Sequence, residues 1–433
     1  MIKMKKYDDI SSELFVKNRS NYSKFLKENS MAIFHSCDLM PRVGDGTHTF
    51  RQNSDLLYLS GIDQEETTLL IFPNAPIEKY REILFIRKTS EHIAVWEGRK
   101  YTPEEARKQS GIQTVLLSDQ FESIFSMLMN YAQTLYININ ENDRAISDVP
   151  YKDVRFAHEC KAKYPLHHYE RSGPIMSKLR SVKHSLEIEQ LQKACDITEK
   201  AFRRVLSFVK PGVTEYEIEA EIIHEFIKNR ATGHAYNPII ASGVDSCVLH
   251  YNDNNKACQD GEVLLMDFGA EYANYCADLT RTIPVNGRFT DRQKQVYNAC
   301  LRVHREACNI MKPGITLAEL NEEVAKVVES ELIGLGLFSK DDVAKQDANN
   351  PLYKKYFMHG NSHFLGLDVH DIGNRYEKLP VGVVLTNEPG IYIPAEKIGI
   401  RIENDIWVSD KGNIDLMKNI PIEVEEIESL MNA

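Results

Sequence analysis

A short motif occurs twice in the sequence, and it constrains the fold more than any other feature. Lys-Pro-Gly-[Val/Ile]-Thr stands at 210–214 and again at 312–316. In both copies an apolar-periodic segment precedes the motif, and Glu217 or Glu319 follows the Thr at the spacing of a capping box that begins another helix. Chance could produce so short a match, but the shared flanking pattern favours a duplicated domain. Each half would contain two helices and some strands around a shared sheet, with a crevice at the seam.

The segment before the first copy predicts a long amphipathic helix. From Leu186 to Phe208 apolar residues recur at helical spacing, and Glu187 and Glu189 suit the positive end of the helix dipole. Residues 293–311 predict the corresponding helix before the second copy. The Pro and Gly of each motif are expected to end the first helix, and the Thr is expected to begin the next.

The chain before the first of these helices has a different pattern, in which short apolar runs alternate with helical segments. The runs at 31–35, 68–72 and 83–86 are typical of strands, whereas 22–28 and 103–109 are typical of helices. This alternation predicts an α/β domain.

A polar segment with a Pro and a Gly, residues 161–173, separates the two patterns. A length of 433 residues also suits two domains rather than one. We therefore expect an α+β chain with an α/β domain over 1–170 and a duplicated domain over 171–433.

Composition argues against several classes of partner. The net charge of −11 and the pI of about 5.8 argue against nucleic acid and against an anionic membrane surface. No apolar run approaches the ~20 residues of a membrane span, and the N-terminus lacks the apolar stretch of a signal peptide. The eight cysteines include no CxxC pair, so we expect reduced thiols in a cytoplasmic protein.

Two aspartates lie between the two motif copies. Asp267 ends the apolar run Val263–Met266, and Asp278 lies within a second β-like stretch, 275–282. A turn at 269–274 would pair the two stretches and bring the carboxylates close together. Facing carboxylates repel each other unless they are protonated or share a cation, so a metal site is one interpretation. The alternative is that each Asp only caps or turns the chain.

Three histidines, His359, His363 and His370, fall within one short segment after the second copy. The intervening Gly, Asn and Ser do not suit a zinc-binding HExxH helix, so a loop and a strand are expected. A functional role and a purely structural, hydrogen-bonded role both remain open for them.

Two glutamates follow in β-rich segments. Glu388 precedes a Pro-Gly turn, and Glu403 shares one face of its strand with Arg401, a pattern that a solvated strand face would also explain. Considered together, four carboxylates and one imidazole suit a pair of Mn²⁺, Co²⁺, Fe²⁺ or Zn²⁺ ions. The two Asp come from the first half and the His and two Glu from the second, as a site at the seam requires.

These segments resemble the pita-bread metallopeptidases, the family of methionine aminopeptidase, prolidase and aminopeptidase P. The similarity extends over 185–409, and HGNSHFLGLDVHD at 359–371 is similar to the proline-specific branch, as are LHYNDN at 249–254 and EPGIYIP at 388–394. Residues 51–73 resemble the creatinase-like N-terminal domain of aminopeptidase P and the longer prolidases. The resemblance implies a pseudo-twofold pita-bread catalytic domain preceded by that α/β domain.

The resemblance also implies roles for individual residues. Five would ligate a dinuclear metal centre: Asp267, Asp278, His363, Glu388 and Glu403. Four would contact the substrate: His250, His359, His370 and Tyr392. Arg401 would hydrogen-bond a ligating carboxylate, and Glu388 would also shuttle a proton. Asn404 stands where relatives usually carry Asp. It directly follows the candidate ligand Glu403 but is not itself a ligand position.

From this resemblance we expect an Xaa-Pro aminopeptidase, a metal-dependent hydrolase of peptides with proline in the second position. A hydroxide bridging two metal ions would attack the carbonyl before the proline, with Mn²⁺ expected and Co²⁺, Zn²⁺ or Fe²⁺ as alternatives. Prolidase, which cuts only Xaa-Pro dipeptides, is the main alternative, and a non-catalytic pita-bread binding protein is a lesser one. Relatives with this N-terminal domain also imply a homo-oligomer, a dimer or a tetramer.

Overall fold

The computed structural model describes residues 7–142, 144 and 148–433, which divide into two compact units. One unit is 9–180, and the other is 181–433 together with residues 7 and 8. The first six residues, part of the stretch expected to lack a signal peptide, lie outside the described part. In the part that the structure describes, no helix is long and apolar enough to cross a membrane.

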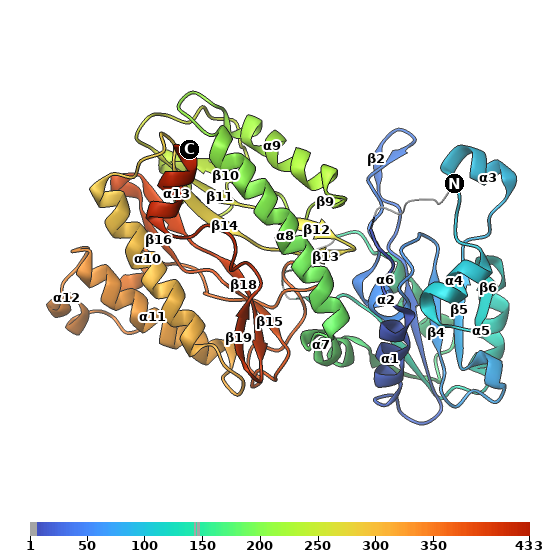
Figure 1. The fold of residues 1–433 in the computed structure, drawn as a ribbon. Helices are drawn as coiled ribbons and strands as arrows, with labels where there is room; N and C mark the ends of the chain where they lie inside the picture. The colour runs from blue at the N-terminus through green and yellow to red at the C-terminus, as the bar shows by residue number, and fades with distance from the viewer. Residues whose placement is uncertain (1–6, 143, 145–147) are drawn as a thin grey trace. The chain divides into compact units, whose positions relative to one another are not determined.

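A six-stranded sheet forms the centre of unit 9–180 (Figure 1). Its strands in spatial order are β6 (Thr114–Leu117), β5 (Glu82–Ile86), β4 (Thr68–Ile71), β1 (Ser30–His35), β7 (Thr134–Ile137) and β8 (His168–Arg171). β1 is buried along its whole length, and it pairs on both sides, antiparallel with β4 and parallel with β7. The strands predicted at 31–35, 68–72 and 83–86 are confirmed as β1, β4 and β5.

Helices pack against this sheet and complete an apolar core. They are α1 (Ser12–Ser23), α2 (Ser54–Ser60), α4 (Pro103–Ser110), α5 (Phe121–Met129) and α6 (Lys152–Lys163). Of the other two helices, α3 (Glu91–Glu97) buries none of its residues, and α7 (Gly173–Ser181) follows β8 along the chain. Phe125 of α5 and Phe156 of α6 share the core with Ile33 of β1. The helix predicted at 103–109 is confirmed as α4. The helix predicted at 22–28 is wrong, because α1 already ends at Ser23 and the chain must turn through Asn29, at φ +52°, to enter β1.

In unit 181–433 each copy of the motif joins two helices that pack against each other (Figure 1). The pairs are α8 (Ser185–Phe208) with α9 (Glu215–Lys228), and α10 (Asp291–Ile310) with α11 (Leu317–Gly334). Gly212 and Gly314 have φ of +94° and +91°, the left-handed region that favours glycine, which explains the Gly of the motif. The backbone N–H groups of Thr214 and Thr316 each donate to the capping glutamate at 2.8 Å. The predicted duplication of helix, motif and helix is confirmed.

Three three-stranded antiparallel sheets accompany these helices in the described part of the unit, and two of them, one from each half, lead into the candidate site. The first contains β10 (Ile239–Ser242), β11 (Val263–Asp267) and β14 (Thr280–Pro284), and the second contains β15 (Val384–Asn387), β18 (Asn404–Ser409) and β19 (Gly412–Asp415). A hairpin of β16 (Gly390–Ile393) and β17 (Ile398–Arg401) lies between β15 and β18 along the chain. The backbone N–H of Glu403 donates to the carbonyl of Thr280 at 3.1 Å, so the two halves are joined by the backbone at their seam.

Candidate active site

The two aspartates of the first half come together at the end of β11. Asp267 is the last residue of that strand, and Asp278 lies two residues before the start of β14. Gly269 allows the returning chain to pass close by, since a Cβ atom there would lie 1.7 Å from the carbonyl oxygen of Ala277. As a result, the Oδ1 atoms of Asp267 and Asp278 both lie 2.5 Å from the hydroxyl of Tyr236.

The pairing of this segment differs in detail from the expected hairpin. β11 pairs with β14, so Thr280 rather than Asp278 lies opposite Asp267. The residues between them form a separate small hairpin of β12 (Ala270–Tyr272) and β13 (Tyr275–Cys276). The two aspartates are therefore not paired directly across neighbouring strands. The β12–β13 hairpin between them brings the chain back, so that Asp278 lies close to Asp267.

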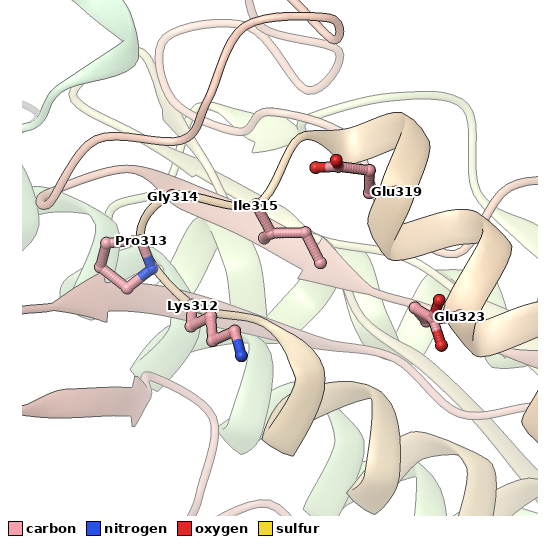
Figure 2. Close-up of a pocket in the computed structure, with 6 residues that line it drawn as sticks. All are labelled: Lys312, Pro313, Gly314, Ile315, Glu319 and Glu323. Carbon is pink, nitrogen blue, oxygen red and sulfur yellow. The ribbon is translucent and has the colours of Figure 1, made fainter.

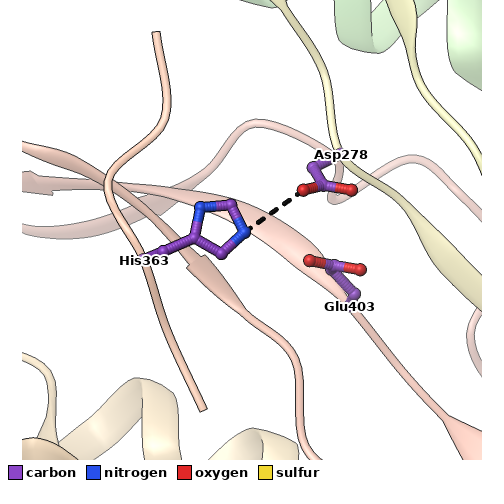
Figure 3. A group of neighbouring side chains, drawn as sticks. All are labelled: Asp278, His363 and Glu403. Atoms are coloured by element: carbon purple, nitrogen blue, oxygen red, sulfur yellow. Dashed lines mark ion pairs between the residues drawn. The ribbon is translucent and has the colours of Figure 1, made fainter. Parts of the chain in front are cut away.

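The second half supplies His363, Glu388 and Glu403. The Nε2 atom of His363 lies 3.3 Å from Oδ2 of Asp278 and 3.6 Å from Oε1 of Glu388. Glu403 follows β17 and accepts a hydrogen bond of 2.6 Å from the Thr280 hydroxyl. Asp278, His363 and Glu403 each point a ligand atom toward the same space, all within 4.8 Å of one another (Figure 3).

Burial of these charges shifts their pKa values strongly. Burial and the charges of Asp278 and Glu388 raise the pKa of Glu403 well above its ordinary value. Burial also raises the pKa of Glu388, to about 7, although the charge of His363 opposes this change. Burial alone would lower the pKa of His363, but its hydrogen bond to Asp278 and the charge of Glu388 raise it to about 9.

The donor set fits divalent cations. Four carboxylates share this space with two cationic side chains, His363 and Arg401. Buried carboxylates at such distances repel each other unless further positive charge is present. Oxygen donors with one imidazole are the ligands that Mn²⁺, Co²⁺, Fe²⁺ and Zn²⁺ accept.

A chain of hydrogen bonds connects Arg401 with His359. Arg401 is buried and donates to Oδ2 of Asp267 at 2.5 Å and to the hydroxyl of Tyr392 at 2.9 Å. The Tyr392 hydroxyl lies 2.8 Å from Nε2 of His359, and burial lowers the pKa of that histidine to about 4. Because Nδ1 of His359 lies 2.8 Å from the Gly360 carbonyl, the neutral ring donates there and accepts the tyrosine hydrogen at Nε2.

The two remaining histidines are exposed. The ring of His370 lies 4.5 Å from the ring of His363, centroid to centroid, in an edge-to-face arrangement. His250 lies on the loop after η3 (Gly243–Cys247). Among the described residues no hydrogen bond links His250 to the metal-ligand candidates. The other nine predicted residues form one connected set of contacts.

Tyr236 is a residue of this centre that sequence analysis missed. Its hydroxyl lies between two candidate ligands, but only the fold brings it there. The one local signal is an Asn-Pro pair directly after it, before the buried strand β10, and that pattern is typical of any turn.

Replacing Tyr236 by phenylalanine is expected to weaken the binding of Mn²⁺ by about 10- to 100-fold, the usual effect of removing a group that orients metal ligands. Isothermal titration of metal-free protein with Mn²⁺ measures the change. Tyr376→Phe, at a tyrosine that is 74% exposed, is the matched control and should bind as the unaltered protein does. Equal affinities for all three proteins would contradict a role for the Tyr236 hydroxyl.

A separate surface pocket of about 400 Å³ lies at the second copy of the motif (Figure 2). It is lined by Lys312, Pro313, Gly314, Ile315, Glu319 and Glu323. None of these is a candidate ligand, and the Glu319 carboxylate is already engaged in capping α11. The chemistry therefore belongs to the buried cluster and not to this pocket.

Comparison with known proteins gives matches over both units. The model of metallopeptidase family M24 matches residues 189–410, and the model of the aminopeptidase P N-terminal domain matches residues 15–136. An Xaa-Pro aminopeptidase of Escherichia coli (strain K12) is 33% identical, covering 98% of this chain and 99% of the relative. One of Haemophilus influenzae is 31% identical, covering 98% of each chain.

Solved structures agree with these matches. Pseudomonas aeruginosa aminopeptidase PepP superposes with a TM-score of 0.88 at 30% sequence identity, covering 98% of both chains. Zn-substituted E. coli aminopeptidase P in complex with product gives a TM-score of 0.86 at 32% identity, covering 98% of this chain and 99% of that one.

Proposed function

This chain belongs to metallopeptidase family M24, and we propose that it is an Xaa-Pro aminopeptidase, which releases the N-terminal residue from peptides with proline in the second position. The expected fold, an α/β N-terminal domain before a pita-bread catalytic domain, is confirmed by the same matches. The observation that carries the proposal is the full-length similarity to Xaa-Pro aminopeptidases together with a complete set of five ligand candidates at the seam of the two halves.

In this proposal two divalent ions are held by Asp267, Asp278, His363, Glu388 and Glu403. Mn²⁺ is the expected metal, and Co²⁺, Zn²⁺ or Fe²⁺ are the alternatives. When bound, such ions polarise a carbonyl and lower the pKa of water enough for hydroxide to be present near neutral pH.

The side chains of the protein have separate tasks in this reaction. Glu388 lies between His359 and His363, 3.9 Å and 3.6 Å from their ring nitrogens, and passes a proton to the leaving prolyl nitrogen. Arg401 holds Asp267 and Tyr392 in place, and Tyr392 in turn orients His359 toward the substrate. His250 and His370, which are both exposed, bind or orient the substrate and the tetrahedral intermediate.

A comparison of tripeptide and dipeptide substrates tests the proposal. Purified, Mn²⁺-loaded protein is expected to cleave Xaa-Pro-Xaa peptides and release the first residue. Cleavage of Xaa-Pro dipeptides alone would instead identify a prolidase. Absence of cleavage on both, unchanged by Glu388→Ala, would favour a non-catalytic binding protein.

Three further expectations stay predictions. They are domain limits at 1–170 and 171–433, a homo-oligomer that is a dimer or a tetramer, and a cytoplasmic location. Sedimentation of the purified protein measures the second of these directly.

A further inference from the structure

Glu215, the first residue of α9, is completely buried, and its carboxylate accepts four hydrogen bonds. Oε1 accepts from the backbone N–H of Ser242 at 2.9 Å and from its hydroxyl at 2.8 Å. Oε2 accepts from the backbone N–H of Lys256 at 2.9 Å and from the hydroxyl of Tyr251 at 2.8 Å. No predicted role in the active site uses this residue.

The donors to Glu215 lie at both ends and in the middle of the loop 242–256, which carries His250. Ser242 is the last residue of β10, Lys256 ends the loop, and Tyr251 directly follows His250. The backbone N–H of Glu215 also donates to the Lys256 carbonyl at 2.9 Å. His250 itself is exposed, so its position depends on how the loop is held.

The internal repeat shows that helix formation does not require a carboxylate at this position. Leu317 occupies the equivalent place in the second copy of the motif, where it is buried as an apolar residue. Both α9 and α11 begin with the same capping box, formed by the Thr and the Glu three residues later. A buried carboxylate costs solvation free energy that only its hydrogen bonds offset, so Glu215 is explained by the loop and not by the helix.

We propose that Glu215 is a positioning residue for the peptidase reaction. Its carboxylate fixes the loop 242–256 and thereby places His250 where it contacts the substrate. This inference rests on the proposed function, in which His250 is a substrate contact.

Glu215→Gln tests the inference with little change in size. The amide nitrogen cannot accept a hydrogen bond, so one end of the loop loses its acceptor. We expect kcat/KM for an Xaa-Pro-Xaa peptide to fall by about 10- to 100-fold, as displacement of a catalytic group by about 1 Å does. Metal content should be unchanged, and full activity of Glu215→Gln would overturn the proposal.

A double-mutant cycle separates positioning from general destabilisation. In the His250→Ala background, Glu215→Gln should cause less than about a twofold further loss, because the residue it positions is gone. The same loss in both backgrounds would overturn the proposal. Glu217→Ala, which removes the capping carboxylate of the same helix, is the matched control and should keep kcat/KM within about twofold.

Two further measurements keep the outcome decisive. Tyr251→Phe removes one donor and no buried charge, so it should fold and show a smaller loss that also disappears in the His250→Ala background. Hydrogen exchange of the loop 242–256 needs no catalysis and should be faster in Glu215→Gln than in Glu217→Ala. If the unaltered protein cleaves no Xaa-Pro-Xaa peptide, the proposed function fails, whereas unchanged loop exchange would overturn the anchoring by Glu215.

Discussion

Replacing Asp278 by asparagine is expected to lower kcat/KM for Xaa-Pro-Xaa peptides by about 1,000-fold or more and to release most of the bound metal. Asp278 has one carboxylate oxygen 3.3 Å from Nε2 of His363 and the other 2.5 Å from the Tyr236 hydroxyl, at the centre of the ligand cluster. An amide carries no negative charge and presents donors on one side, so it cannot replace a carboxylate shared between metal ions. Metal content per chain and steady-state kinetics measure the two effects.

The control for this substitution is an aspartate of the same unit that lies away from the cluster. Asp260 is exposed and accepts a hydrogen bond from Asn286, so Asp260→Asn should retain full activity and full metal content. Removal of metal from the unaltered protein by a chelator should reproduce the loss seen for Asp278→Asn, and added Mn²⁺ should restore only the unaltered protein. A metal-loaded Asp278→Asn protein with more than about a tenth of normal activity would contradict the assignment.

The sequence predicted correctly those helices whose ends are determined by residues close to them in the chain. The capping glutamates Glu217 and Glu319 are three residues from their partners, so their role is visible in the sequence. The helix expected at 22–28 failed because Asn29 must turn the chain into the central strand β1, and that requirement comes from the sheet. The pairing of Asp267 with Thr280 was also missed, because it depends on the separate hairpin of β12 and β13 that interrupts the chain between them.

The site was predictable where the residue type itself indicates chemistry. Carboxylates and histidines are residue types that bind metal ions, so they could be selected as candidates, and the family resemblance supplied their grouping. Tyr236 could not be selected in this way, because it is one of 20 tyrosines and only the fold places it between two carboxylates. Glu215 could not be selected either, because α9 carries several other glutamates. Only the fold shows that the donors to its carboxylate come from a loop more distant in the sequence.

The loops that carry His250 and His370 are held by similar backbone hydrogen bonds but by different side chains. In the first half the backbone N–H of Gly212 donates to the Cys258 carbonyl at 2.8 Å, and in the second that of Gly314 donates to the Leu379 carbonyl at 2.9 Å. Both motif copies thus bind the end of a loop through the backbone. The side-chain anchors differ, because the second half has Leu317 in place of Glu215.

The loop of His370 is anchored by the buried pair of Lys183 and Asp371, with Nζ 2.9 Å from Oδ2 and both side chains 1% exposed. Replacing Lys183 by methionine is expected to lower the free energy of unfolding by about 3–5 kcal/mol, because the buried Asp371 carboxylate loses its ammonium partner. The pKa of the nearby Glu187, raised to about 6 by burial, is held down by the charge of Lys183, so a second buried carboxyl group loses the same support. Urea unfolding measures the change.

Two further substitutions, one at the buried partner and one at an exposed ion pair, test whether the buried charge causes the loss of stability. Combining Lys183→Met with Asp371→Asn removes both charges and should recover part of the lost stability, since a neutral amide is less costly to bury than an uncompensated carboxylate. Lys193→Met breaks a pair that lies largely in solvent, with Nζ 3.4 Å from Oδ2 of Asp8, and should cost less than about 1 kcal/mol. A cost for Lys183→Met as small as that of Lys193→Met would mean that the loop of His370 is held by its backbone contacts and not by this ion pair.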